Sequence, residues 1–308
     1  MSGQAKPSEP NFWLHVPLQT TRGDWLRPPA GGRLTVLGHS CRLCAQDLPN
    51  IPTGMSASPI MVRQYLLFDP LPEAQARKLL DDLILRMPVL AFKERVSYEV
   101  PHAWIEKRED FGVHNITAPA LIASHLEPKA AAAYVYSSSH REATDFLESK
   151  LAACPVVSDE RIRAAIDLAN ASRNEALPRS IFLSWLTILD SLVTRKERPV
   201  NVCNWLEEKI TEAHKLKEPG LAAALGNLKH ESHSSAIRHL IEIAGRAIGE
   251  DEAQVKAQQV SATQLYRIRS GLSHSGTTML DPANVNDACA LARFVLETAL
   301  QYPNILEE

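Results

Sequence analysis

Apolar residues recur with helical period in nearly every segment after residue 158. Ser158, Asp159 and Glu160 suit the first turn of a helix, because polar and acidic groups stabilise a helix N-terminus. The most regular apolar stripe follows Pro178 and consists of Phe182, Trp185, Leu186, Leu189, Leu192 and Val193. Further stripes predict helices over the ranges 202–210, 234–248 and 282–302. Together they predict an all-α bundle over residues 155–308.

The first half of the chain has shorter runs, because proline and glycine interrupt it repeatedly before residue 60. The apolar run MVRQYLLF precedes Asp69 and Pro70, which predict the start of a helix. The apolar face of that helix consists of Ala76, Leu79, Leu80, Leu83 and Ile84. After Pro88, the runs VLAF and VSYEV predict two strands. This order predicts a small α+β domain with a loop-rich start over residues 1–154.

Composition and charge narrow the class of protein. The 308 residues are 45% hydrophobic and 22% charged, which allows a sizeable core. No run approaches the ~20 apolar residues of a membrane span, and the start MSGQAKPSEP lacks a signal-peptide pattern, so we expect a cytoplasmic protein without membrane contact. Five cysteines do not indicate a disulfide framework. The formal net charge is −3 and neither half is basic, which argues against nonspecific duplex binding but allows a local basic site.

One segment, LYRIRSGLSHSG at 265–276, breaks the apolar pattern of the second half. Arg269 and His274 lie about 140° apart on an ideal helix, so they converge only if the helix distorts or ends between them. Gly271 allows such a break. A permanent guanidinium charge and an imidazole that titrates near neutrality suit phosphodiester chemistry, because the first neutralises a phosphate and the second transfers a proton. From spacing alone, a solvated turn is the favoured interpretation of the same residues.

The segment resembles the signature of HEPN domains, in which a histidine follows an arginine after four to six residues. It is similar in particular to the Apea-like branch, with its Leu-Tyr, Arg, His, Gly arrangement. The helix RSIFLSWLTILDSL, 179–192, resembles an earlier helix of that branch, in which an apolar stripe ends in an acidic residue. The resemblance covers about 158–302. It implies a helical domain that dimerises so that two motifs share one cleft, and many such domains cut RNA without a metal.

The resemblance also implies roles for individual residues. Arg269 would bind the scissile phosphate, and His274 would be the general acid or base. Asp190 stands where active relatives often have Glu and would orient the motif, unless it is simply an exposed acid near a helix end. Ser270 stands where the family often places a larger polar residue, so a catalytically inactive HEPN domain is an open alternative. Beside the motif, Tyr266 and Arg267 would stack on a base and contact phosphate, or Tyr266 would pack against the last helix.

Two other groups of polar residues have weaker patterns. His39, Cys41 and Cys44 form the start of a zinc-site pattern, but no second pair of ligands follows nearby, so ordinary thiols are favoured. A second cluster, near the start of the helix at 234–248, consists of His230, Glu231, His233 and His239. These side chains could chelate a metal or contact RNA, although a solvated helix entry is favoured. No cofactor or metal is therefore predicted.

The resulting hypothesis is a cytoplasmic protein with two functional parts. The N-terminal α+β domain is a sensing or adaptor domain that receives an activating protein or ligand. The C-terminal bundle forms a homodimer and acts on RNA as a metal-independent endoribonuclease, in anti-phage defence or a toxin-like response. The rival hypothesis is a noncatalytic HEPN module that binds nucleotide, RNA or a partner and contributes dimerisation only.

Overall fold

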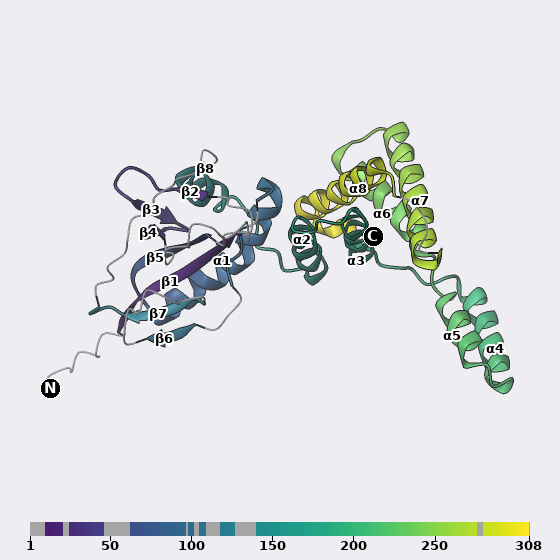
Figure 1. Ribbon diagram of the computed structural model, residues 1–308. Coiled ribbons are helices and arrows are strands. Elements are labelled where there is room, and N and C mark those ends of the chain that lie inside the picture. The colour runs from purple at the N-terminus through teal and green to yellow at the C-terminus, as the bar shows by residue number, and fades with distance from the viewer. Residues whose placement is uncertain are drawn as a thin grey trace, which may run out of the picture. The chain divides into compact units, whose positions relative to one another are not determined.

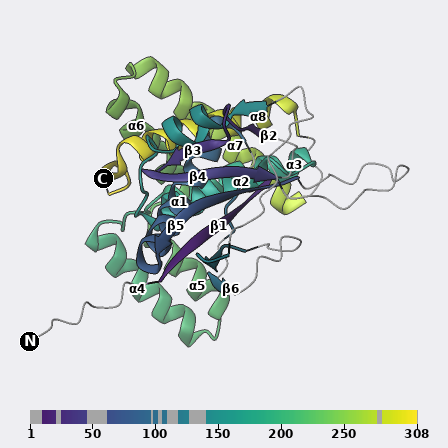
Figure 2. The ribbon, with the colours of Figure 1, turned by 90° about the vertical axis from the view of Figure 1, so that its left-hand side faces the viewer.

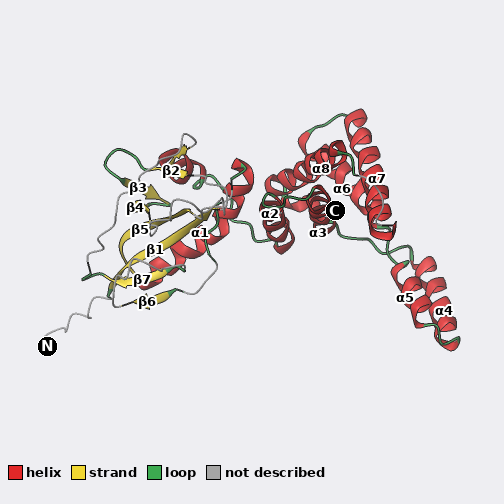
Figure 3. Ribbon diagram, in the orientation of Figure 1, coloured by secondary structure: helices red, strands yellow, loops and turns green. Residues whose placement is uncertain are grey.

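The computed structural model divides the chain into two compact units, Met1–Val157 and Ser158–Glu308 (Figure 1). The sequence-based boundary lies slightly earlier, after residue 154. The backbone is described for the ranges 10–20, 25–45, 62–96, 98–101, 105–108, 118–126, 140–275 and 280–307. The first unit combines a sheet with helices and the second is helical, which confirms an α+β part followed by an all-α part (Figure 3).

The N-terminal unit is built around a six-stranded sheet with the order β3-β4-β5-β1-β7-β6. Its strands are β1 (Asn11–Thr20), β3 (Arg33–Val36), β4 (His39–Ala45), β5 (Val62–Pro72), β6 (Glu106–Arg108) and β7 (Ala120–Ala123). All neighbours pair antiparallel except β6 and β7, which are parallel. The long helix α1 (Glu73–Glu94) packs against β1 and β5 (Figure 2). A short parallel pair, β2 (Trp25–Arg27) with β8 (His140–Glu142), and the π-helix η1 (Thr144–Lys150) complete the unit.

A buried side-chain amide joins the two sheets of this unit. The Gln64 side chain on β5 accepts a hydrogen bond from the Leu26 N–H at 2.9 Å and donates one to the Leu26 carbonyl at 2.8 Å. Gln64 thereby satisfies both backbone groups of Leu26, as a neighbouring strand would. Since Leu26 and Gln64 are almost fully buried, this contact fixes β2 against the core.

Two local predictions in the N-terminal unit are wrong. Asp69 does not cap a helix, because it lies within β5 and its carboxylate accepts a hydrogen bond from Arg33 Nη1 at 2.7 Å. The helix begins four residues later, at Glu73. The run VLAF is not a strand but the last part of α1, which continues through Pro88. Its apolar side chains are buried, and this packing outweighs the helix-breaking tendency of proline. VSYEV forms only an isolated bridge at Glu99 among its described residues.

The C-terminal unit contains α2 (Glu160–Ser172), α3 (Pro178–Leu192), α4 (Val200–Lys215), α5 (Pro219–Asn227), α6 (His233–Ile248), α7 (Glu252–Ser275), α8 (Pro282–Gln301) and the 3₁₀ helix η2 (Pro303–Leu306). Asp159 and Asp281 cap α2 and α8 by accepting backbone N–H groups. Gly249 ends α6 in the left-handed conformation that a glycine adopts easily, with φ of 79°. The bundle core forms where α3 packs against α2 and α8, and α6 packs against α7 and α8.

Helices α4 and α5 form a hairpin that projects from the other helices of this unit (Figure 1). The predicted apolar stripe of α4 is therefore largely unused in the bundle core. Trp205 has 54% of its surface exposed, and only Leu206 and Ala213 of α4 are buried. The prediction of a helix at 202–210 is confirmed, but this helix packs against the short helix α5 and not in the bundle core. Across the described part of the chain, no helix has the length and apolar character needed to cross a membrane.

Candidate functional site

Three helices of the C-terminal unit meet at the carboxylate of Asp190, in the last turn of α3. Asp190 Oδ1 accepts a hydrogen bond of 2.7 Å from the Tyr266 hydroxyl on α7. Asp190 Oδ2 forms an ion pair with Nη1 of Arg269, one turn further along α7. At the start of α6, His233 Nδ1 lies 3.6 Å from Asp190 Oδ1. We call Asp190, Tyr266, Arg269 and His233 the Asp190 network.

Helical spacing explains why two members of this network come from α7. Tyr266 and Arg269 are three residues apart, so they lie on the same face of the helix. The Arg269 guanidinium carbon is 5.5 Å from the centre of the Tyr266 ring, a cation–π distance. The Tyr266 hydroxyl is also 3.3 Å from the Leu186 carbonyl, one turn before Asp190 on α3. These contacts hold the polar face of α7 against the C-terminal half of α3.

The electrostatics of the network keep Tyr266 neutral. Burial, followed by the charge of Asp190, raises the pKa of Tyr266 far above its usual range, so its hydroxyl remains a donor to the carboxylate. Only 18% of the Asp190 side chain is exposed, against 31% for Arg269. A guanidinium has five N–H donors, and the ion pair engages Nη1. The ion pair thus holds Arg269 in one orientation while part of its guanidinium stays accessible to an anion.

The structure brings some of the predicted site residues together and leaves others apart. Asp190 contacts Arg269 and Tyr266, so it is not an isolated exposed acid. The Tyr266 hydroxyl bonds to α3. Arg267 and Ser270 are exposed on α7, away from these contacts. The side chain of His274 lies outside the described residues, although its backbone belongs to α7.

The break that Gly271 would allow does not occur, because α7 continues unbroken to Ser275. Leu265 and Leu272, seven residues apart on one face, are both almost fully buried. In addition, Arg179 Nη2 on α3 donates a 2.8 Å hydrogen bond to the Leu272 carbonyl. These contacts outweigh the ~1 kcal/mol that a glycine costs inside a helix. Positions 269 and 274 therefore remain about 140° apart around the helix axis.

A cavity of about 480 Å³ adjoins the Asp190 network, and His233 belongs to both. Its lining residues are Arg195, Arg198, Asn227, Leu228, His230, Glu231, Ser232 and His233. Sequence reasoning identified His230 and His233 but missed the two arginines. The signal was present, since Arg195 and Arg198 belong to the basic run RKER between two helices. Local sequence patterns do not show that the two arginines lie close to His230, because the whole α4–α5 hairpin separates them in the chain.

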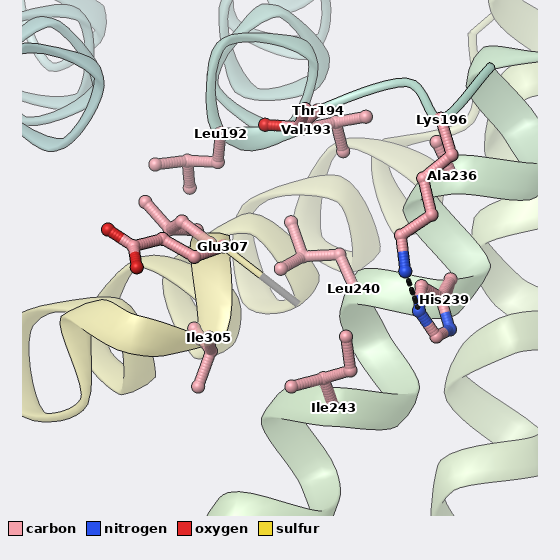
Figure 4. A pocket seen from close by; sticks show the side chains of 11 residues that line it. Leu192, Val193, Thr194, Lys196, Ala236, His239, Leu240, Ile243, Ile305 and Glu307 are labelled. Carbon is pink, nitrogen blue, oxygen red and sulfur yellow. Dashed lines mark hydrogen bonds between the residues drawn. The ribbon is translucent and has the colours of Figure 1, made fainter. Parts of the chain in front are cut away.

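A second, smaller cavity of about 130 Å³ is mostly apolar (Figure 4). Leu192, Leu240 and Ile243 line it, and the Lys196 side chain extends to His239 at its edge. Lys196 Nζ is 3.2 Å from His239 Nε2. His239 therefore lies apart from His230 and His233, and the four polar residues of the predicted cluster do not form one site.

The His39, Cys41 and Cys44 pattern of the N-terminal unit lies on a core strand, β4. Cys41 and Cys44 are buried in β4, and Cys44 packs with Tyr65 and Leu67. Burial raises the pKa of Cys41 to about 12 and also raises that of Cys44, so both are neutral thiols. Among the residues that the structure describes, no three His, Cys, Asp or Glu side chains are grouped to hold a metal ion.

Comparison with known proteins found no matching family model, no matching curated protein and no matching solved structure. The Asp190 network and the cavity beside it are the features of the helical unit whose side-chain chemistry points to a function.

Proposed function

We propose that the helical unit is a HEPN-like domain that cuts RNA as a metal-independent endoribonuclease, working as a homodimer. The observation that carries this proposal is the contact between Asp190 and Arg269. It joins the two separate segments in which the sequence resembles HEPN domains, the helix 179–192 and the motif 265–276. A carboxylate that orients the motif arginine is the arrangement that the resemblance implies.

The proposed chemistry follows from what each side chain can do. Arg269 binds the scissile phosphate through the guanidinium N–H groups that are not bonded to Asp190. The ribose 2′ oxygen attacks phosphorus while its proton passes to a general base, and the bond from phosphorus to the 5′ oxygen breaks as that oxygen takes up a proton. His274 supplies one of these two proton transfers. The products are a 2′,3′-cyclic phosphate and a 5′ hydroxyl.

The continuous course of α7 supports a site made from two copies of the chain. Positions 269 and 274 are separated by about 140° around the axis of α7, so a phosphate held by Arg269 is not readily reached from position 274 of the same helix. Across a two-fold axis, the second copy presents its own position 274 to that phosphate. In this scheme each dimer has two equivalent sites.

The N-terminal α+β unit is proposed as the sensing or adaptor part, which receives an activating protein or ligand in the cytoplasm. A role in anti-phage defence or a toxin-like response follows from the HEPN resemblance alone. The competing function is a noncatalytic HEPN module that binds RNA, nucleotide or a partner. The exposed Ser270, which stands in place of a larger polar residue, favours that alternative.

Incubation of the purified full chain with a total RNA pool in EDTA tests the proposal. Wild type should produce fragments with 2′,3′-cyclic phosphate ends, and His274→Ala should leave the pool intact. Cleavage that requires added Mg²⁺, or cleavage that is equal in both proteins, contradicts the proposed chemistry.

A further inference from the structure

The cavity beside the Asp190 network has cationic side chains that the fold holds in fixed positions. Arg195 donates from Nε to the Glu231 carbonyl at 2.8 Å and from Nη2 to the Asn227 carbonyl at 2.9 Å. Arg198 donates from Nε to the Leu228 carbonyl at 2.9 Å. Backbone carbonyls orient a guanidinium without cancelling its charge, because they carry no net charge. Both arginines are therefore oriented by the fold and remain cationic.

The segment that carries both arginines is joined to the segment that carries His230 at the base of the α4–α5 hairpin. Glu197 and His230 form an antiparallel bridge. The Arg198 N–H donates to the Lys229 carbonyl at 2.8 Å, and the Glu231 N–H donates to the Lys196 carbonyl at 3.0 Å. The bridge sets the arginines on one segment opposite His230 on the other. Backbone hydrogen bonds therefore fix the two segments that line the cavity relative to each other.

Two acidic side chains lie at or near the cavity, and each already has a partner. Glu231 Oε1 accepts the Lys196 N–H at 3.1 Å. Glu197 Oε1 is 3.9 Å from His230 Nε2, and the Glu197 side chain is 78% exposed. By contrast, the structure records no hydrogen bond from the Nη atoms of Arg198 to another described residue. A guanidinium with free donors in a cavity is suited to a phosphate oxyanion, which accepts two parallel N–H bonds.

We infer that this cavity binds a phosphate group of the RNA strand, next to the phosphate held by Arg269. The inference rests on the proposed function and adds a second contact to it. His233 carries the connection, because it lines the cavity and its Nδ1 is 3.6 Å from the carboxylate that holds Arg269. A strand that crosses the Asp190 network thereby continues into the cavity. Phosphate contacts of this kind position a strand without reading its sequence.

The decisive variant is Arg198→Gln in the full chain. The glutamine Nε2 is as many bonds from the backbone as the arginine Nε, so it can keep the hydrogen bond to the Leu228 carbonyl while the charge is lost. Arg246→Gln is the matched control, because Arg246 is an exposed arginine of α6 outside the cavity. Arg198→Lys is a second variant, which keeps the charge but loses the planar fork. Thermal unfolding checks that all three remain folded.

Binding is measured by fluorescence anisotropy with a short, labelled, mixed-sequence single-stranded RNA, with His274→Ala present in every protein to prevent cleavage. Arg198→Gln should raise the Kd about tenfold, the loss expected for one charge-assisted contact. It should also lower the slope of log Kd against log salt by about 0.7, because one phosphate is no longer neutralised. Arg198→Lys should keep the slope, and Arg246→Gln should change neither quantity.

Several results separate this inference from the proposed function. If Arg198→Gln binds RNA like the control, the phosphate site is wrong, even when wild type cuts RNA in EDTA. If Arg198→Gln weakens RNA binding but wild type cuts nothing, the site is supported and the proposed cleavage fails. Free ATP, measured in the same way, distinguishes the source of the phosphate. Loss of ATP binding with unchanged RNA binding would overturn the assignment to an RNA strand.

Discussion

Arg269 on α7 forms an ion pair with Asp190 on α3, although 79 residues separate them in the chain. The pair is partly buried, and the Tyr266 hydroxyl occupies the other oxygen of the same carboxylate. Asp190 therefore both orients a cation and ties two helices of the bundle together. Two substitutions of Asp190 can separate these effects. Asparagine keeps the size of the side chain and a hydrogen-bonding oxygen but loses the charge, whereas alanine removes the whole polar group.

The first prediction concerns the stability that Asp190 provides. Asp190→Asn should lower the free energy of unfolding by about 1–2 kcal/mol, because the amide oxygen still accepts one hydrogen bond but the ion pair is lost. Asp190→Ala should cost about 2–3 kcal/mol, because it leaves two partly buried partners unsatisfied. Urea unfolding followed by circular dichroism measures both changes.

Glu212→Gln provides the control for Asp190. Glu212 pairs with Lys209 at 2.9 Å on the surface of α4, where its side chain is 58% exposed. Loss of such a pair should cost less than about 0.5 kcal/mol. Equal effects of Asp190→Asn and Glu212→Gln would contradict the structural role given to Asp190.

Helix ends and apolar faces of the C-terminal unit were readable from sequence, because they depend on neighbouring residues. Asp159, Asp281 and Gly249 end or begin helices through contacts within one turn. The resemblance singled out Asp190 and Arg269, but their charged groups meet only because α6 and α8 each contact both α3 and α7 in the folded bundle. These contacts join segments that are far apart in the chain, so local sequence patterns do not indicate them.

Other features were missed because distant packing decides them. Pro88 lies inside α1, since the apolar residues after it are buried in the core. Gly271 lies inside α7, held by the buried Leu272 and by the hydrogen bond from Arg179. The cavity arginines are oriented by carbonyls about 30 residues away in sequence. Periodicity and composition describe none of these contacts.

The second prediction concerns the stability that the Tyr266 hydroxyl provides at alkaline pH. Burial and the charge of Asp190 raise the pKa of Tyr266, so the folded protein keeps the proton that the unfolded chain releases at about pH 10. The stability from this hydroxyl is complete below about pH 10 and is lost as the pH rises further. Tyr266→Phe should cost about 1 kcal/mol at neutral pH. That difference from wild type should shrink above about pH 10, whereas a constant difference in urea unfolding would contradict the assignment.

The third prediction concerns His15, which is buried in β1 with its ring 4.5 Å from that of Tyr65. Burial, with a smaller contribution from Arg108, lowers the pKa of His15 from 6.5 to about 4. Between about pH 6.5 and 4, the His15 imidazole is therefore protonated in the unfolded chain but neutral in the folded protein. The N-terminal unit should lose roughly 2–3 kcal/mol of stability as the pH falls through this window.

His15→Leu removes the titrating group and should flatten this part of the pH profile. The exposed His125 provides the matched control, and His125→Gln should keep the wild-type profile. Thermal unfolding at a series of pH values compares the three proteins. A profile for His15→Leu that falls as steeply as that of wild type would exclude His15 as the cause.

The fourth prediction separates binding from proton transfer in the motif. Arg269 cannot lose its proton near neutral pH, so Arg269→Ala should weaken RNA binding as well as turnover. His274→Ala should keep most of the RNA affinity but lose roughly two to four orders of magnitude in rate, as expected when a general acid or base is removed. Anisotropy gives the affinities and single-turnover cleavage gives the rates. Equal losses of affinity in both variants would contradict this division.

In the proposed dimer, each cleavage site takes Arg269 from one chain and His274 from the second copy. Mixing Arg269→Ala with His274→Ala under conditions in which dimers exchange decides whether the site is shared in this way. Each mixed dimer then contains one complete site and one that lacks both groups. Random pairing makes about half of the dimers mixed, so the mixture should recover about a quarter of the wild-type cleavage rate from two nearly inactive proteins. A mixture that stays as inactive as its components, while wild type cuts RNA in EDTA, would show that the site is not shared between two chains.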